Sequence, residues 1–217
     1  MAKIYLMRHS STYYNDLDMF AGKLDIPLSK NGILKTIEIA QTSNALELDY
    51  VLTSCMSRSI QTALIFLSFS NMSKIPILVN KNKKKINESL LPVIKYKELN
   101  ERNYGLLENR IKQDVEQEYG ENLVFDWRRN FNATPPKGES FEDVVERVRK
   151  VYCDLITLLE KDKNILIVAH QNTLRALWYL FFNIDNKNIE EIEFDNNEIS
   201  CLEYNNKGFK VLYEKNS

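Results

Sequence analysis

The chain contains two histidines, and each follows a short run of apolar residues. His9 comes after residues 4–7 and Arg8, and His170 comes directly after residues 165–169. Continuous apolar runs of this length are typical of strands that are covered on both faces in a parallel sheet. Ligands of open α/β sheets bind beyond the carboxyl ends of the strands. The two histidines therefore indicate a shared ligand site, and the alternative is that each imidazole only bonds to backbone at a strand end.

Two arginines favour phosphoryl chemistry at such a site. Arg8 precedes His9, and Arg58 lies just after a third β-rich run, 50–53, where a following helix would present its N-terminal amides to an anion. A neutral imidazole is a nucleophile, and the planar guanidinium group neutralises and orients a phosphoryl group. Seen alone, Arg58 fits a surface position in a first helical turn equally well. Metal binding is disfavoured, because neither histidine has an H-E-x-x-H motif or a closely spaced carboxylate partner.

The elements that would position these side chains alternate along the chain, which predicts one α/β domain with a mostly parallel central sheet. A helix is predicted from Ser29, as its N-cap, to about residue 46, and a longer one over 139–160. The stretch 98–136 has helical patterns and no strand, so it is predicted to be a helical insertion over the sheet. Strands are predicted at 4–7, 50–53, 77–79, 93–96, 165–169, 200–203 and 209–213.

Composition excludes several function classes. The chain has 29 basic and 30 acidic residues and a pI near 6.2, so no global field favours nucleic acid or an anionic membrane. The lysine-rich run 81–85 is predicted to be a solvated turn. Three distant cysteines without metal spacing predict free thiols in a reducing, cytoplasmic setting. No segment resembles a signal peptide or a membrane span.

Six segments resemble, in order, the motifs of the cofactor-dependent phosphoglycerate mutases, which belong to the histidine phosphatase superfamily. The match extends over nearly the whole chain, with spacing similar to that of the family. The resemblance implies a three-layer α/β sandwich over residues 1–217, with the insertion at about 98–136 covering an active site. The six segments are LMRHSSTYYN, TSCMSRSIQTA, LNERNYGLLENRIK, WRRNF, PPKGESFEDVVERV and VAHQNTLRAL.

The resemblance implies a catalytic role for each aligned residue. His9 would be the nucleophile that becomes phosphohistidine, and Glu101 would be the proton donor and acceptor. Fixed cations around the transferring group would carry most of the catalysis, which agrees with the physics of phosphoryl transfer. 2,3-Bisphosphoglycerate would be the phosphoryl primer, and no metal would be needed. The phosphoryl group would be held by Arg8, Asn15, Arg58 and His170.

The resemblance also implies the substrate, because positions outside the catalytic core match those that hold phosphoglycerates. The implied activity is the interconversion of 3-phosphoglycerate and 2-phosphoglycerate in glycolysis and gluconeogenesis, by a monomer or homodimer that binds small molecules. Without the surrounding motifs, residues 126–131 would be an amphipathic helix with Trp127 in the core and two solvated arginines. The glycerate carboxylate and distal phosphate positions are Tyr104, Lys112, Arg128 and Arg129, and further substrate contacts are Ala21, Gly22 and Asn172.

Two departures from the family pattern flank the expected phosphate site. Ser10 and Gln171 stand where the family has glycine after each histidine. If either position needs φ > 0, its Cβ costs about 1 kcal/mol, so restoring both glycines is expected to raise turnover or leave it unharmed. The usual T-G-x-P turn is also absent at 195–199. Two other functions stay open: a phosphatase of the same superfamily, since GLLEN resembles a G-x-x-E motif, and a binding module that keeps the fold without activity.

Overall fold

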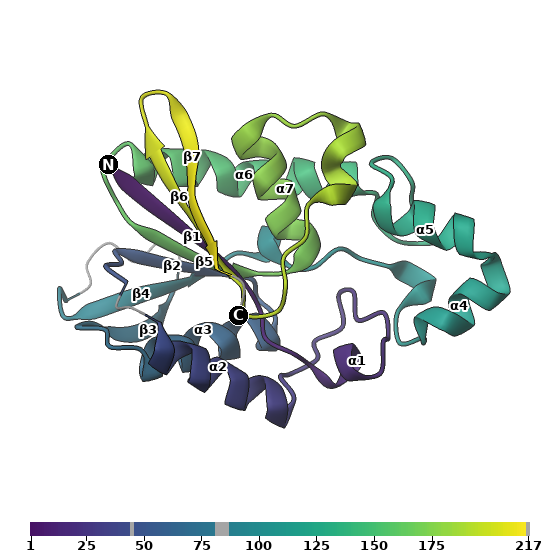
Figure 1. The fold of residues 1–217 in the computed structure, drawn as a ribbon, viewed down its shortest axis with the longest axis horizontal. Helices are drawn as coiled ribbons and strands as arrows, with labels where there is room; N and C mark the ends of the chain where they lie inside the picture. Colours follow the sequence, from purple (N-terminus) through teal and green to yellow (C-terminus); the bar gives the residue numbers. More distant parts are fainter. Residues whose placement is uncertain (44–45, 81–86, 216–217) are drawn as a thin grey trace.

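A seven-stranded sheet forms the centre of the computed structural model, which describes residues 1–43, 46–80 and 87–215 (Figure 1). The lysine-rich run 81–85 lies outside the described residues. All seven predicted strands are confirmed, in the spatial order β3-β4-β2-β5-β1-β6-β7. Their bounds are β1 Ala2–Arg8, β2 Tyr50–Thr53, β3 Ile75–Val79, β4 Leu90–Lys95, β5 Ile165–Ala169, β6 Ile199–Asn205 and β7 Gly208–Lys215.

The sheet is mostly parallel, as predicted. β3, β4, β2, β5 and β1 run parallel, and β6 and β7 add an antiparallel edge next to β1. β1 and β5 are neighbours, with Ile4 opposite Ile165 and Arg8 opposite Ala169. Both strands therefore end at the same level, and the residues that follow them meet at one edge of the sheet.

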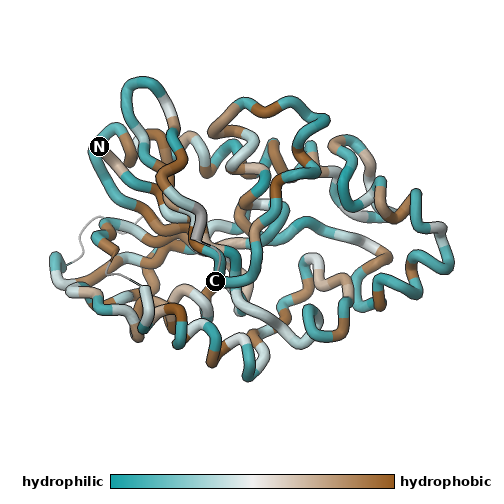
Figure 2. The backbone as a smooth tube through the Cα atoms, in the orientation of Figure 1, coloured by the Kyte–Doolittle hydropathy of each residue, from teal (hydrophilic) through white to brown (hydrophobic). Residues whose placement is uncertain are grey.

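Helices cover both faces of the sheet. α6 (Phe141–Leu159) and α7 (Gln171–Phe182) lie on one face, and α2 (Lys30–Thr42) and α3 (Ser57–Phe69) lie on the other (Figure 1). Successive residues of β1 alternate between two cores: Ile4 and Leu6 pack with α6 and α7, whereas Tyr5 and Met7 pack with α2 and α3. The central strands are accordingly among the most hydrophobic segments in Figure 2. Burial on both faces explains why these runs are apolar throughout.

Helix starts agree with the capping residues in the sequence. Ser29 accepts a hydrogen bond from the Gly32 N–H at 3.1 Å and begins α2, while Ser140 and Asp143 form a capping box at the start of α6. α2 ends at Thr42 rather than near residue 46, because the next residue is extended with ψ 144°. Leu48 is therefore outside the helix, although it is buried in the core.

The segment between β4 and α6 contains no strand, as predicted, and all of it is described. It forms two 3-10 turns, η1 (Lys97–Leu99) and η2 (Gly105–Leu107), followed by α4 (Lys112–Tyr119) and α5 (Glu121–Arg129). A small core joins these elements to the loop after β1 and consists of Phe20, Leu107, Val115, Val124 and Trp127. Trp127 thus lies in a core, as the amphipathic-helix alternative for this segment expected. α1 (Tyr13–Asp16), η3 (Asn186–Glu191) and α7 were not predicted.

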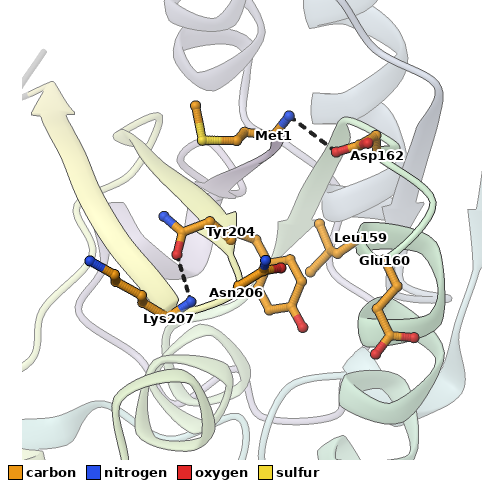
Figure 3. Close-up of a pocket in the computed structure, with 8 residues that line it drawn as sticks. Met1, Leu159, Glu160, Asp162, Tyr204, Asn206 and Lys207 are labelled. Carbon is orange, nitrogen blue, oxygen red and sulfur yellow. Dashed lines mark hydrogen bonds and ion pairs between the residues drawn. The ribbon is translucent and has the colours of Figure 1, made fainter.

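A pocket of about 610 Å³ lies at the amino end of β1 (Figure 3). The N-terminal ammonium group and Asp162 form an ion pair of 3.1 Å at this pocket. None of the residues with predicted catalytic or substrate roles lines it. Its lining residues are Met1, Leu159, Glu160, Asp162, Tyr204, Asn205, Asn206 and Lys207.

Candidate active site

The two histidines lie side by side at the carboxyl ends of β1 and β5. The His9 N–H donates to the carbonyl of Ala169 at 3.0 Å, which extends the strand pairing by one residue. The two imidazole centroids are 5.0 Å apart, and the ring planes are inclined by 60°. Both side chains are buried. The predicted juxtaposition is therefore present, and it follows from the register of two central strands.

One ring nitrogen of His9 is hydrogen-bonded, and the other has no hydrogen-bond partner among the described residues. Its Nδ1 lies 2.7 Å from the Ser10 carbonyl oxygen. A carbonyl oxygen only accepts, so Nδ1 carries the proton and Nε2 keeps its lone pair. Burial, followed by the positive charges of Arg58 and Arg8, holds the pKa of His9 well below its usual value. The ring is thus neutral and has the tautomer that a nucleophilic Nε2 requires.

His170 is fixed in the opposite tautomer. Arg58 Nε donates to His170 Nδ1 at 3.3 Å, so the proton of the neutral ring is on Nε2, which donates to the Ser54 hydroxyl at 2.8 Å. Burial, then the charges of Arg58 and His9, hold the pKa of His170 well below its usual value. Ser54 follows the last residue of β2, and the sequence reasoning missed it although it ends a strand at the same edge.

We expect the protein to lose stability as the pH falls below about 6.5. A histidine with a lowered folded-state pKa binds more protons when unfolded, between its folded and unfolded pKa values. Each of His9 and His170 then contributes up to about 1.4 kcal/mol per pH unit in that window. Urea unfolding across this pH range measures the slope, and His9→Gln should reduce it. An equal slope in that variant would contradict the assignment.

Arg58 and Arg8 bring positive charge to the histidines. Arg58 is in the first turn of α3 and is 1% exposed; its Nη1 and Nη2 donate to the carbonyls of Leu24 and Gly22 at 2.7 and 2.9 Å. Arg8 Nη1 donates to the carbonyl of Phe194 at 2.8 Å. Arg8 Nε is buried and has no hydrogen-bond partner among the described residues. A buried, unpaired N–H of a cation is suited to an anionic ligand.

Glu101 lies close to both arginines. Burial lowers the pKa of Arg8 and of Arg58, and for each the carboxylate of Glu101 is the largest opposing influence. Glu101 Oε1 accepts from the Arg102 N–H at 2.8 Å and from Asn172 Nδ2 at 3.2 Å. The same Asn172 nitrogen is 3.3 Å from the Tyr104 hydroxyl oxygen. Three of the predicted residues, Glu101, Tyr104 and Asn172, are thus joined in one network.

The three outer cations predicted from the sequence are each paired with a carboxylate of the chain. Lys112, at the start of α4, pairs with Asp18. In the last turn of α5, Arg128 lies 3.7 Å from Glu116, and Arg129 pairs with Glu193. The arginines are therefore not simply solvated, which the amphipathic-helix alternative had expected.

The loop after β1 holds the remaining predicted residues. Asn15 Oδ1 accepts from the Thr12 N–H and hydroxyl at 2.9 and 2.8 Å, so Asn15 forms a capping box with Thr12, the N-cap of α1. The Ala21 carbonyl accepts from the Leu24 N–H in a turn. Gly22 has φ +49°, and a Cβ there would lie 2.1 Å from Glu108 Oε1. The positive φ favours glycine at this position, whose carbonyl accepts from Arg58.

Ser10 and Gln171 show none of the backbone strain that the sequence comparison raised. Neither is among the described residues with positive φ. Ser10 is fully buried, and its hydroxyl donates to the Gly32 carbonyl and accepts from Asn197 Nδ2, both at 2.8 Å. The Ser10 side chain therefore joins β1, α2 and the turn before β6. The Gln171 amide contacts residues 192–194 instead.

This finding changes the expected effect of restoring glycine at position 10. We expect Ser10→Gly to destabilise the fold by about 1–3 kcal/mol, because it leaves the buried Asn197 amide without its acceptor. Denaturant unfolding measures the loss. Ser10→Ala should show a similar loss, since it keeps the Cβ and removes only the hydroxyl. A stabilised or unchanged Ser10→Gly variant would contradict the prediction.

A metal-ligand cluster and a membrane-spanning helix are both absent from the described parts of the chain. These parts contain no group of three or more His, Cys, Asp or Glu side chains that could hold a metal ion. They also contain no helix long and apolar enough to cross a bilayer. Cys55, Cys153 and Cys201 are free thiols, as the sequence predicted.

Comparison with known proteins shows the family of the chain. A 2,3-bisphosphoglycerate-dependent phosphoglycerate mutase of Chlamydia trachomatis is 36% identical over 186 residues, 82% of each chain. Its counterpart in Chlamydia felis is 35% identical over 187 residues, also 82% of each chain. An alpha-ribazole phosphatase structure from Shigella flexneri has a TM-score of 0.79 and 26% identity, covering 99% of this chain and 96% of the other. Because residues 4–217 match the family model described as histidine phosphatase superfamily (branch 1), this chain belongs to that superfamily.

Proposed function

We propose that the protein is a 2,3-bisphosphoglycerate-dependent phosphoglycerate mutase. It is an intramolecular phosphotransferase, of the isomerase class, that interconverts 3-phosphoglycerate and 2-phosphoglycerate in cytoplasmic glycolysis and gluconeogenesis. The observation that carries the proposal is His9, whose Nε2 is free while its Nδ1 is bonded 2.7 Å from a carbonyl oxygen. We take residues 1–217 as one domain, with the segment 98–136 covering this site.

His9 performs the phosphoryl transfer. Its Nε2 attacks phosphorus, the N–P bond forms, and the bond from phosphorus to the departing oxygen breaks. The proton stays on Nδ1 and keeps its hydrogen bond to the Ser10 carbonyl oxygen, which stabilises the charge of the phosphorylated ring. Arg8 Nε, buried without a partner among the described residues, donates to a phosphoryl oxygen, and Arg58 and His170 keep the surroundings positive and polar.

Glu101 moves the proton of the substrate hydroxyl. The two hydrogen bonds to its carboxylate both use Oε1, so Oε2 is the oxygen that takes the proton. As the hydroxyl oxygen attacks the phosphohistidine, Glu101 accepts its proton and the N–P bond breaks. In the reverse half-reaction Glu101 returns the proton to the departing oxygen. Asn172 holds the carboxylate in place for both halves.

The outer residues hold the other end of the phosphoglycerate. Tyr104, Lys112, Arg128 and Arg129 bind its carboxylate or distal phosphate, with Asn15, Ala21, Gly22 and Asn172 as further contacts. The unpaired buried nitrogen of Arg8 and the cations at this edge suit a polyanion. 2,3-Bisphosphoglycerate, when bound, supplies the phosphoryl group that loads His9. No metal is needed, because guanidinium groups already supply the positive charge.

A phosphatase is the second candidate. The observation that favours it is that Lys112, Arg128 and Arg129 are each paired with a carboxylate of the chain, which weakens retention of a second anionic group. The solved structure from Shigella flexneri is likewise that of a phosphatase. In this case water, rather than a phosphoglycerate hydroxyl, accepts the phosphoryl group from His9.

Assaying both reactions on one preparation tests the proposal. Conversion of 3-phosphoglycerate to 2-phosphoglycerate should depend on added 2,3-bisphosphoglycerate and should exceed release of inorganic phosphate. A chelator should leave the rate unchanged. Release of phosphate from phosphoesters without any mutase activity, with or without the primer, would select the phosphatase instead.

A further inference from the structure

The carboxylate of Glu193 is bound on both of its oxygens at the edge of the site. Oε1 pairs with Arg129 Nη1, and Oε2 accepts from Gln171 Nε2 at 2.6 Å. The same Arg129 nitrogen donates to the Glu190 carbonyl at 3.3 Å. Arg129, which the proposed function assigns to ligand binding, is therefore already paired with the Glu193 carboxylate of the chain itself.

Gln171 fixes this anion in place. Its Oε1 accepts from the Phe194 N–H at 3.1 Å, and because a backbone N–H only donates, the amide nitrogen must face Glu193. The carbonyl of Phe194 accepts from Arg8 Nη1 at 2.8 Å. Residues 193 and 194 thus connect the outer arginine Arg129 to the inner arginine Arg8. A glycine at position 171 has no side chain to make either bond.

We propose that Glu193 is a specificity-determining residue that acts as an internal anion. It occupies Arg129 until the carboxylate or distal phosphate of a ligand replaces it, and Gln171 holds it ready to return. This inference rests on the proposed function, because that function assigns Arg129 to the distal anion of the substrate. A ligand with one anionic group gains no binding free energy by displacing Glu193 from Arg129. Glu193 therefore changes the affinity only for ligands with two anionic groups.

The exchange is feasible because the pair is partly exposed. The side chains of Arg129 and Glu193 are 26% and 50% exposed, and water screens such pairs. Loss of the competing charge should therefore tighten ligand binding modestly, by about two- to fivefold. The gain must require Arg129, since Glu193 acts by occupying it.

The chain contains a matched control pair. Glu118 and Arg110 form an ion pair with side-chain exposures of 51% and 31%, and neither has a proposed role in the site. Calorimetric titration with 3-phosphoglycerate compares the wild-type protein with Glu193→Gln and Glu118→Gln. We expect Glu193→Gln to lower the Kd about two- to fivefold and Glu118→Gln to leave it unchanged. In an Arg129→Ala background, Glu193→Gln should have no effect.

The outcomes separate the inference from the proposed function. Suppose that Arg129→Ala weakens binding but Glu193→Gln leaves the Kd unchanged, or that Glu193→Gln lowers the Kd by the same factor in the Arg129→Ala background. In either case the internal-anion role is wrong and the proposed function stands. If the wild-type protein does not bind 3-phosphoglycerate, or Arg129→Ala leaves its Kd unchanged, the assignment of Arg129 is wrong and the inference fails with it. Inorganic phosphate, which has one anionic group, should bind the wild-type and Glu193→Gln proteins with the same Kd. A lower Kd for the variant would also overturn the internal-anion role.

Discussion

Replacing His9 with alanine should abolish the phosphoenzyme and lower mutase turnover by at least about ten-thousandfold, as loss of a catalytic nucleophile does. The wild-type protein, incubated with labelled 2,3-bisphosphoglycerate, should carry a phosphoryl group that is stable in base and labile in acid. The reason is that Nε2 of His9 is the free nitrogen of a buried, neutral imidazole held by the Ser10 carbonyl.

The control is Ser11→Ala, a neighbouring change that keeps the backbone carbonyl bonded to the Ser29 N–H. It should be labelled like the wild-type protein. Label that persists in His9→Ala, or that maps to a serine, would show that another side chain is the nucleophile. Vanadate, which mimics a trigonal phosphoryl group, should inhibit the wild-type protein.

Removing Arg128 and Arg129 together should cut mutase activity about 100-fold or more, since each charged hydrogen bond is worth roughly 1.5–3 kcal/mol. Mutase turnover needs the bisphosphorylated intermediate to stay bound while it reorients, and these two arginines at the end of α5 are the residues assigned to its far end. Phosphorylation of His9 by a small phosphoester should survive, because Arg8 and Arg58 remain. The ratio of the two rates is the measurement.

A matched control removes two arginines elsewhere. Arg110 and Arg149 also form exposed ion pairs with glutamates, and replacing both with alanine changes the net charge by the same amount. That variant should keep the ratio of the wild-type protein. Equal losses of both reactions in the Arg128→Ala, Arg129→Ala variant, or no loss of either, would make the phosphatase the better function.

The strands and the positions of both histidines could be predicted from the sequence because they depend on local patterns. Runs such as 165–169 are apolar throughout since both faces are covered, and His170 follows directly after the last residue of β5. Ser29 likewise gave the start of α2 through capping, and the apolar stripe over 139–160 gave α6. The register of β1 against β5 then brings His9 to His170 without any information from the loops.

The ion pairs and hydrogen bonds of the outer side chains could not be predicted, because they join segments that are far apart in the sequence. Nothing in the local pattern of residues 190–194 indicates that Glu193 meets Arg129, 64 positions earlier, or that Gln171 binds it. The buried contact of Ser10 with Asn197 spans 187 positions. Such pairs depend on the paths of long loops, for which the sequence has no periodic signal.

The pairing of β1 with β5 has a consequence for how this protein is made. Both sheet neighbours of β1, the strands β5 and β6, are synthesised more than 150 residues after it. At about 5–20 residues per second, this apolar strand waits roughly eight to thirty seconds for its sheet neighbours. His9 can therefore meet His170 only after this long intervening stretch has been made, so the catalytic pair forms late relative to β1 itself.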